Sequence, residues 1–368
     1  MRIIVVAPKN KTILSYRVDL IKDMISNGHE VMIVGPDREY VDDLMAIGIS
    51  EFIEVPIVCD NTSVMGDLRY LFALKKVFKE KKPDLVFGYT IKPVIYGSLA
   101  AKAAKVPHIY SMVTGLGRIF TSSSLKAKMV KMIVKMLYKR AFKACDKVIF
   151  QNGDDIKELV SERYLPESKC VKVNGSGVNM ENFSPAPLPE KPTFLMVGRI
   201  IREKGVLEYC EAARAVKKDH PDARFILLGG FDTSIGAIKR EDIQGYIDDG
   251  SIEFPGEVKD PIEYYKNSSA FVLPSYYGEG LPKSILEAMS CGRAIITTDW
   301  TGCREPIIDG ENGYLIPIKD VSALIEKINL LIEDRELLAK MGENAHQTCK
   351  ERFEVSIINK AMRETLGY

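Results

Sequence analysis

Residues 270–298 read AFVLPSYYGEGLPKSILEAMSCGRAIITT, and this stretch decides the fold. A short apolar run, Ala270–Pro274, leads into a glycine-containing turn, and a second apolar run follows at Ala294–Thr297. Short continuous apolar runs are typical of strands buried on both faces of a parallel sheet. Pro282 suits the first turn of a helix between the two runs. The stretch therefore predicts a strand, a turn, a helix and a second strand.

The same alternation of strands and helices runs through the rest of the chain. Helical patterns include Tyr16–Asn27, which ends at Gly28, and Val206–Asp219. Alternating strands and helices predict parallel, doubly wound α/β sheets. The other expected strands are residues 3–7, 29–35, 84–88, 107–112, 147–151, 193–197, 224–228, 251–254 and 313–316.

The alternation is interrupted once, at Ser184–Pro192, where SPAPLPEKP holds four prolines. Such a segment reads as a linker, and a length of 368 residues suits two domains. We therefore expect two Rossmann-like domains, residues 1–185 and 186–368, facing each other across a cleft. The C-terminal tail would be free to pack back on the first domain. Ligands of such sheets bind at the carboxyl ends of the strands.

Composition narrows the functional classes. Apolar residues make up 46% and charged residues 27% of the chain, which is a globular mixture. The net charge of +1 indicates no nucleic-acid partner, but residues 1–185 carry 28 basic and 20 acidic residues. That excess in the first half favours an anionic surface as its partner. The cysteines are isolated from one another in the sequence, which suits a reducing cytoplasm. No apolar run is long enough to span a membrane.

A basic loop follows the first expected strand of the second half, at Gly198–Gly205 (GRIIREKG). Gly198 would let the backbone approach a ligand closely. Arg199 offers a planar fork suited to phosphate, and Lys204 offers a point charge. Together they could hold a diphosphate and stabilise the negative charge that leaves with it. The alternative is an ordinary solvated basic loop.

A second constellation lies in the opening stretch, where Glu279 precedes the expected helix and Glu287 lies within it. The free N–H groups of Gly280 and Leu281 lie at the positive end of that helix. They suit hydroxyl or phosphate oxygens, and the two carboxylates can each accept hydrogen bonds from a polyol. The alternative is a pair of solvated surface carboxylates.

These residues resemble family 4 of the retaining nucleotide-sugar glycosyltransferases, which have the GT-B fold. The resemblance covers nearly the whole chain, and within the family it is closest to bacterial enzymes that extend lipid-linked sugars for capsule, exopolysaccharide, O-antigen or N-glycan precursors. The motifs that carry it are Gly198-Arg199…Lys204-Gly205, Glu279-x7-Glu287, Gly230, Gly256, Thr301–Glu305, Tyr89–Pro93, Thr114–Gly117 and Asn174–Asn179.

The resemblance implies roles for the second domain. Arg199 and Lys204 would contact the donor diphosphate, and Glu287 would bind the ribose. Glu279, with the N–H groups of Gly280 and Leu281, would bind the donor sugar, and Gly256–Val258 would lie beside the base. The first domain would bind the acceptor. Attack would occur on the front face of the sugar, with the donor phosphate helping to deprotonate the acceptor.

The chain departs from many relatives in its first half. The loop Ala7–Thr12 has no glycine where paired glycines are common, and Ser111–Gly115 has no histidine beside the expected sugar position. Contacts of the first domain to the donor sugar therefore stay open. Lys92 and Arg118 are candidates for the phosphates of the acceptor.

No Asp-x-Asp sequence occurs, so we expect no metal and no other cofactor besides the substrate, a UDP-sugar. The expected acceptor is an undecaprenyl-diphosphate-linked saccharide. Two rivals remain: a UDP-sugar 2-epimerase of the same fold, and a non-catalytic nucleotide-sugar sensor.

A lysine-rich stretch without acidic residues spans Leu125–Lys143. Its methionines and other apolar residues cover a wide arc of a helical wheel, which suits either a covering helix or an interfacial helix on anionic lipid. The second reading predicts a peripheral protein on the cytoplasmic face of the plasma membrane. The lysine stripe expected to meet the lipid is Lys128, Lys131, Lys135 and Lys139.

Overall fold

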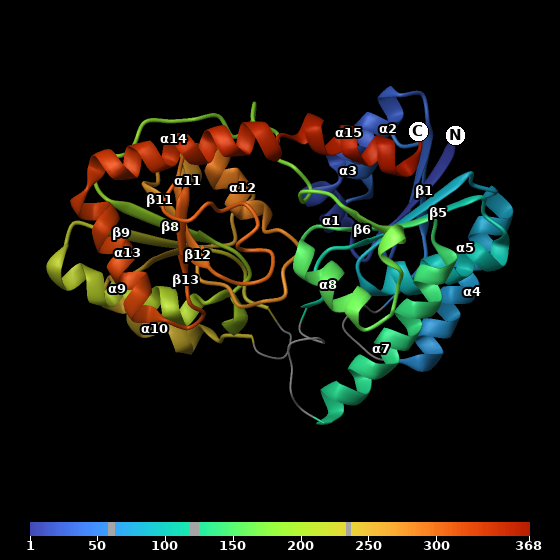
Figure 1. Ribbon diagram of the computed structural model, residues 1–368, viewed down its shortest axis with the longest axis horizontal. Helices are drawn as coiled ribbons and strands as arrows, with labels where there is room; N and C mark the ends of the chain where they lie inside the picture. The colour runs from blue at the N-terminus through green and yellow to red at the C-terminus, as the bar shows by residue number, and fades with distance from the viewer. Residues whose placement is uncertain (58–62, 118–124, 233–236) are drawn as a thin grey trace. The chain divides into compact units, whose positions relative to one another are not determined.

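The structure, a computed structural model, describes residues 1–57, 63–117, 125–232 and 237–368, with the side chains of 125–131 outside the description. The chain divides into two compact units (Figure 1). The first comprises Met1–Ser176 and Ser356–Tyr368, and the second comprises Gly177–Val355. Each unit is built around its own parallel sheet, as the alternation of strands and helices predicted.

The first unit holds a seven-stranded sheet in the order β3-β2-β1-β4-β5-β6-β7. All of its strand pairs are parallel. The chain order reverses between β1 and β4, which makes their carboxyl ends the topological switch point. The strands are Arg2–Val6 (β1), Glu30–Gly35 (β2), Glu51–Glu54 (β3), Leu85–Tyr89 (β4), His108–Val113 (β5), Lys147–Phe150 (β6) and Cys170–Lys172 (β7).

Helices cover both faces of this sheet, because alternate residues of a strand point to opposite faces. Ile4 and Val6 pack with α4, α5, α7 and α8, whereas Ile3 and Val5 pack with α1, α2, α3 and α15. The helices are Asn10–Tyr16 (α1), Val18–Ser26 (α2), Val41–Met45 (α3), Val64–Lys81 (α4), Pro93–Gly97 (η1), Ser98–Ala104 (α5), Leu125–Ala144 (α7), Gly153–Ser161 (α8), Glu167–Lys169 (η2) and Val355–Leu366 (α15).

The C-terminal helix α15 packs on the first unit. The side-chain amide of Asn359 donates a hydrogen bond of 3.2 Å to the carbonyl of Asp19 on α2. Arg363 forms an ion pair with Asp23 of the same helix. The tail thereby completes the apolar layer on one face of the first sheet, through Ile358 and Met362.

The second unit holds a six-stranded parallel sheet in the order β10-β9-β8-β11-β12-β13. Its strands are Thr193–Val197 (β8), Arg224–Leu228 (β9), Glu253–Gly256 (β10), Ala270–Leu273 (β11), Ala294–Thr298 (β12) and Gly313–Ile316 (β13). Its helices are Arg202–Lys204 (η3), Val206–Asp219 (α9), Arg240–Asp248 (α10), Ile262–Lys266 (α11), Lys283–Ser290 (α12), Val321–Glu333 (α13) and Arg335–Arg352 (α14).

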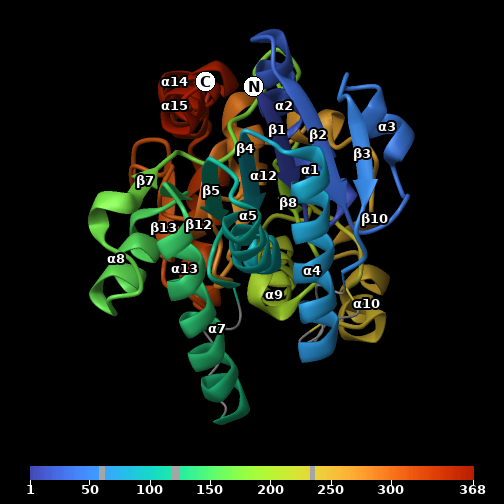
Figure 2. The ribbon, with the colours of Figure 1, turned by 90° about the vertical axis from the view of Figure 1, so that its right-hand side faces the viewer.

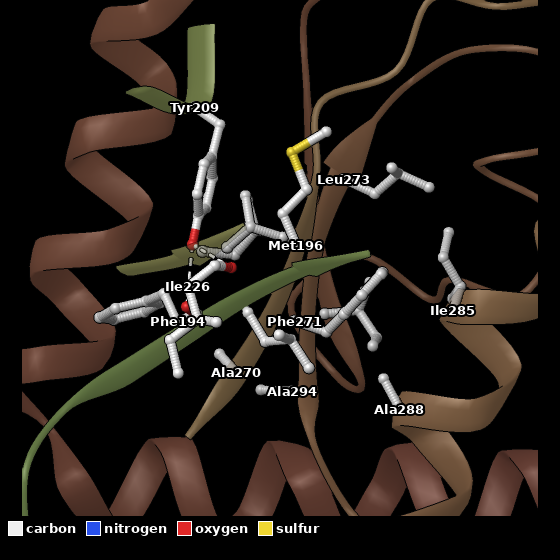
Figure 3. Packing of buried hydrophobic residues seen from close by; sticks show 14 of the residues in the cluster. Phe194, Met196, Tyr209, Ile226, Ala270, Phe271, Leu273, Ile285, Ala288 and Ala294 are labelled. Carbon is white, nitrogen blue, oxygen red and sulfur yellow. Dashed lines mark hydrogen bonds between the residues drawn. The ribbon is translucent and has the colours of Figure 1, made fainter. Parts of the chain in front are cut away.

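The core of the second unit fixes the sheet against its helices (Figure 3). The buried hydroxyl of Tyr209 on α9 donates toward the carbonyl oxygens of Phe194 (2.8 Å) and Ile226 (3.1 Å). Phe194 and Phe225 stack with ring centroids 5.1 Å apart. Because this hydroxyl is hydrogen-bonded, its burial costs little free energy. Its two carbonyl partners lie on the adjacent strands β8 and β9, so the aromatic layer holds these strands in register.

The proline-rich segment is not a linker. The structure divides the chain at Ser176, before this segment rather than at residue 185. The fully buried guanidinium of Arg293 donates to the carbonyl groups of Ala186 and Pro187. The segment therefore packs within the second unit, where its carbonyl groups accept hydrogen bonds from a buried arginine.

Two edge strands, β3 and β7, were not predicted. Both are short, and neither is a continuous buried run. Edge strands of this kind carry little of the apolar signal that central strands show.

Among the helices in the described part of the chain, none is both long and apolar enough to cross a membrane.

Candidate functional site

The two motifs of the second half meet at the carboxyl edge of the second sheet. The loop Gly198–Gly205 follows β8, and the loop that contains Glu279 follows β11. These strands are neighbours, and the chain order reverses between them. Ligands of open α/β sheets bind at this switch point.

Gly205 holds the two loops close together. Its φ of +76° favours glycine, and a Cβ atom there would lie 2.2 Å from the carbonyl oxygen of Pro274. The N–H of Tyr276 donates a hydrogen bond of 2.7 Å to the carbonyl of Glu203 in the first loop. A side chain at position 205 would therefore separate the basic loop from the acidic loop.

Lys204 and Glu279 form an ion pair across these loops. Their side chains are only 11% and 14% exposed, so the pair is largely screened from water. The structure thus brings together two residues that lie 75 positions apart in the sequence. A cation and a carboxylate held at this edge can bind a phosphate oxygen and a sugar hydroxyl side by side.

Arg199 extends the basic side of the site. Its Nη1 donates to Asp232 at 2.8 Å, and its guanidinium lies 5.4 Å from the ring centre of Tyr277. Burial acts to lower the pKa of Arg199, but Tyr277 and Asp232 outweigh it and raise that pKa. About half of the side chain is exposed, so the guanidinium is charged, oriented and reachable from solvent.

Glu287 lies on α12 with a buried partner. The hydroxyl of Tyr265 donates a hydrogen bond of 2.9 Å to Glu287 Oε2, and Lys283 Nζ lies 3.8 Å from Oε1. Burial raises the pKa of the Glu287 carboxyl, whereas Lys283 and the Tyr265 hydroxyl act to lower it. Tyr265 is fully buried and packs edge-on against Phe183. It therefore fixes the Glu287 carboxylate from within the core.

The remaining predicted residues of the second unit line the same edge. Gly280 and Leu281 precede α12, and a Cβ atom at Gly302 would lie 2.6 Å from the Gly280 carbonyl oxygen. Leu281 is itself buried in the core, which anchors the loop. Val258 packs partly buried against that core, two residues beyond the end of β10. The loops that carry these residues thus follow β10, β11 and β12 at the same edge of the sheet.

Three residues of this site were not predicted from the sequence: Asp232, Tyr265 and Tyr277. Asp232 follows β9, so its place after a strand was a usable signal. Tyr277 lies within the quoted motif, but stacking under Arg199 depends on tertiary structure. Tyr265 lies on the short helix α11, and nothing nearby in the sequence links it to Glu287.

The metal prediction is not tested by the fold. Within the described ranges, no cluster of His, Cys, Asp or Glu has the arrangement of a metal site. That the reaction needs no metal stays a prediction.

Of the two residues of the first unit that were predicted to bind the acceptor phosphates, the structure describes one. Lys92 Nζ lies 2.8 Å from Asp67 Oδ1, and the hydroxyl of Tyr96 donates to the other carboxylate oxygen at 2.9 Å. Lys92 therefore already has a carboxylate partner in a largely buried pair. Its role toward an acceptor stays a prediction, and Arg118 lies outside the described residues.

The expected lysine stripe of α7 is wrong at Lys135. That side chain is buried and forms ion pairs with Glu158 of α8 and with Glu162, which directly follows α8, so it does not face a lipid surface. Lys139 is exposed, as are Met132, Ile133 and Met136 of the methionine-rich flank. The side chains of Lys128 and Lys131 lie outside the described residues.

Sequence comparisons agree with this geometry. The family model for glycosyl transferases group 1 matches residues 179–348, and the glycosyl transferase 4-like model matches residues 2–152. One relative is the N,N'-diacetylbacillosaminyl-diphospho-undecaprenol alpha-1,3-N-acetylgalactosaminyltransferase of Campylobacter jejuni, 31% identical over 99% of this chain and 98% of its own. Another is the UDP-Gal:alpha-D-GlcNAc-diphosphoundecaprenol alpha-1,3-galactosyltransferase of Escherichia coli, 30% identical over 87% and 83%.

Solved structures share the fold. Sucrose-phosphate synthase from Thermosynechococcus elongatus superimposes with a TM-score of 0.82 at 19% identity, covering 99% of this chain and 98% of its own. The Anabaena protein HepE in complex with UDP-glucose gives a TM-score of 0.79 at 17% identity, covering 100% and 99%. With its paired parallel sheets and this set of relatives, the chain belongs to the group 1, family 4-like glycosyltransferases of the GT-B fold.

Proposed function

We propose that this glycosyltransferase moves a sugar from a UDP-sugar to an undecaprenyl-diphosphate-linked saccharide, with retention of configuration and without a metal. The observation that carries the proposal is the meeting of Arg199, Lys204 and Glu279 at the switch point of the second sheet. The names of the two relatives from Campylobacter jejuni and Escherichia coli include undecaprenol-linked diphosphate acceptors. HepE was crystallised with UDP-glucose.

The proposed chemistry uses the charges of this site. The bond between the anomeric carbon and the donor phosphate breaks, and a bond forms between that carbon and an acceptor hydroxyl oxygen on the same face. The acceptor proton passes to an oxygen of the leaving diphosphate. Arg199 and Lys204 stabilise the charge that develops on UDP, which is the role that a divalent ion has in other enzymes. Glu279 holds sugar hydroxyls, and Glu287 holds the ribose.

Binding of the donor would change the partners of the Lys204–Glu279 ion pair. In the absence of donor, Glu279 compensates the charge of Lys204. When a diphosphate enters, it supplies negative charge beside Lys204, and the Glu279 oxygens become available to sugar hydroxyls. The site therefore binds diphosphate and sugar together better than either alone.

Membrane attachment is a separate part of the proposal. On α7, Met132, Ile133 and Met136 are exposed next to Lys139 and Arg140. An apolar face with flanking basic residues is typical of a helix that lies in the interface of an anionic bilayer.

The helix α4 adds a second apolar face to the first unit. Val64 and Phe72 are 79% and 61% exposed, and Met65 and Leu68 are exposed between them. Both α4 and α7 pack against α5 and η1, and Figure 2 shows them flanking α5. We infer that α4 and α7 together hold the enzyme on the cytoplasmic leaflet, where its acceptor resides.

The experiment that tests the reaction is UDP release with and without a lipid-linked acceptor. A glycosyltransferase releases UDP in step with acceptor glycosylation. An epimerase converts the sugar without transfer, and a sensor does neither. A screen of UDP-Gal, UDP-Glc, UDP-GalNAc, UDP-GlcNAc and the uronic-acid forms identifies the donor, and NMR of the product tests retention. The matched control is Arg199→Ala, which should leave the fold intact because this side chain is about half exposed, and should weaken the proposed contact to the diphosphate.

A further inference from the structure

Arg17 is a buried cation in the first unit that has only neutral partners. It lies between α1 and α2, and 3% of the residue is exposed. Nη1 donates to the carbonyl of Tyr16 (3.1 Å) and to Ser176 Oγ (2.8 Å), and Nη2 lies 2.9 Å from Met112 Sδ. Nε has no hydrogen-bond partner. In the described part of the chain, no carboxylate pairs with this guanidinium.

Arg293 shows how the same chain satisfies an arginine that has a structural role. It is fully buried in the second unit, and its Nε donates to the carbonyl of Cys291 at 3.0 Å. Its Nη1 donates to the Ser268 carbonyl at 2.8 Å, and its Nη2 donates to the carbonyl of Ala186. Every nitrogen of Arg293 thus meets an oxygen, which is not true of Arg17.

The unsatisfied donors of Arg17 lie along one edge. In a guanidinium, Nε–H and one Nη2–H point the same way and form the fork that binds a carboxylate or phosphate through two parallel hydrogen bonds. In Arg17 this edge meets the thioether of Met112 and no oxygen. Sulfur is a weak acceptor, and a buried charge without a counter-charge costs free energy. Burial accordingly lowers the pKa of Arg17.

Arg17 lies close to the switch point of the first sheet. Its guanidinium lies 5.0 Å from the ring centre of Tyr89, the last residue of β4. The Tyr89 hydroxyl is 2.8 Å from the hydroxyl of Thr12, which follows β1. The strands β1 and β4 flank the switch point of the first sheet, where ligands of such sheets bind.

Access to the fork depends on one flexible side chain. Met112 lies against the Nη2 end of this edge, and methionine is unbranched and repacks readily. Tyr16, the neighbour of Arg17, is 46% exposed, so the junction of α1 and α2 reaches the surface. Met112 is itself buried, so binding of a ligand at this edge requires its side chain to change rotamer.

We propose that Arg17 binds a phosphate of the lipid-linked acceptor through its Nε–Nη2 edge, in place of the Met112 thioether. This inference rests on the proposed function, in which two diphosphates take part. Arg199 and Lys204 of the second unit serve the donor, and Lys92 is already paired with Asp67. Among the described residues of the first unit, Arg17 and Lys135 are the buried cations, and Lys135 has carboxylate partners whereas Arg17 has none.

The test is calorimetric binding of two soluble probes, geranyl diphosphate and UDP, to the full-length protein. Arg17→Met removes the charge at similar volume, and Arg17→Lys keeps the charge but not the fork. We expect both variants to bind geranyl diphosphate at least tenfold more weakly and UDP as the wild type does. Arg199→Ala is the converse control, since it should lose UDP affinity and keep that for geranyl diphosphate. This comparison does not depend on whether sugar transfer occurs.

Thermal unfolding without ligand separates binding from a structural role. Arg17→Met should keep the melting temperature within a few degrees of the wild type, because it removes a charge that lacks a counter-ion. Arg293→Met should lower it strongly, because it leaves several carbonyl groups without donors. The proposal is wrong if the wild type does not bind geranyl diphosphate, if Arg17→Lys binds it normally, or if the Arg17 variants lose UDP instead. If Arg17→Met does not fold, Arg17→Lys decides alone.

Discussion

Lys204 and Glu279 form a largely buried ion pair that ties the basic loop after β8 to the acidic loop after β11. Neither motif by itself indicates that its charge is balanced by the other. Arg199 also pairs with a carboxylate, that of Asp232, but its side chain is about half exposed, whereas that of Lys204 is only 11% exposed. Substitution of Lys204 should therefore affect both catalysis and stability, whereas substitution of Arg199 should affect mainly catalysis.

Removal of either cation should slow sugar transfer. A contact that stabilises the leaving diphosphate is typically worth about 3–4 kcal/mol, so Arg199→Ala and Lys204→Ala should each lower kcat roughly 100–1000-fold. UDP release with a saturating acceptor measures this. Near-normal turnover in both variants would rule out the diphosphate assignment.

The same two positions should differ in stability. Lys204→Met leaves the Glu279 carboxylate without its cationic partner in a screened site, which should cost about 3 kcal/mol of unfolding free energy. Adding Glu279→Gln removes that charge and should recover much of the loss. Arg199→Met should change stability by less than about 1 kcal/mol. Denaturant unfolding of the wild type and these three variants tests this, and equal losses in Lys204→Met and Arg199→Met would contradict a buried pair.

The raised pKa of Glu287 predicts a pH-dependent stability. Because burial favours the neutral carboxyl, the folded protein keeps this proton to higher pH than the unfolded chain does. Stability should therefore fall as pH rises from the ordinary value of 4.5 through the raised pKa, and this loss should level off above it. Glu287→Gln cannot ionise, so its stability relative to the wild type should be greater at about pH 8 than at 4.5. A difference that does not vary with pH would show that Glu287 does not contribute.

Sugar transfer should not depend on a divalent ion. Arg199 and Lys204 supply fixed positive charge where the donor diphosphate is expected, so transfer should continue in excess EDTA. Initial rates with EDTA, and again after addition of Mn²⁺ or Mg²⁺, test this. Loss of activity in EDTA that either ion restores would show that the two cations are insufficient.

The sequence predicted most of the central strands because each is a continuous apolar run that is buried on both faces. Ile3 and Val5 face one helical layer and Ile4 and Val6 face the other, and such a strand is recognisable without its neighbours. The edge strands β3 and β7 lack that run and were missed.

At the site, the sequence located the residues but not their partners. Arg199, Lys204 and Glu279 follow strands, and their loops were recognisable from glycine and charge. Their pairing depends on which strands adjoin, and the sheet order decides that. Likewise, the helical spacing of Lys135 suggested an exposed stripe, but Glu158 of α8 and Glu162 just after it pair with the buried Lys135. Periodicity alone cannot distinguish a lysine that faces solvent from one that faces a neighbouring helix.

The last prediction concerns membrane binding, with the burial of Lys135 taken into account. The basic residues left on the described part of α7 include Lys139, Arg140 and Lys143, all exposed. Each basic residue near an anionic surface contributes about 1 kcal/mol, so changing all three to Glu should weaken binding to anionic vesicles by roughly 100-fold or more. The attraction should also weaken as salt shortens the Debye length. Co-sedimentation with vesicles at low and high salt measures both effects.

The matched control changes as many charges on the second unit, at the exposed residues Lys218, Lys340 and Lys350. It should keep vesicle binding, since those residues lie on other helices. Replacing Met132 and Met136 by Ser should weaken binding even at high salt, because their contribution is burial of apolar surface rather than charge. Activity on a lipid-linked acceptor in vesicles should fall in the α7 variants, while UDP binding stays unchanged. If the wild type does not sediment with anionic vesicles at low salt, or if the control triple variant loses binding equally, α7 is a covering helix with a solvated basic face.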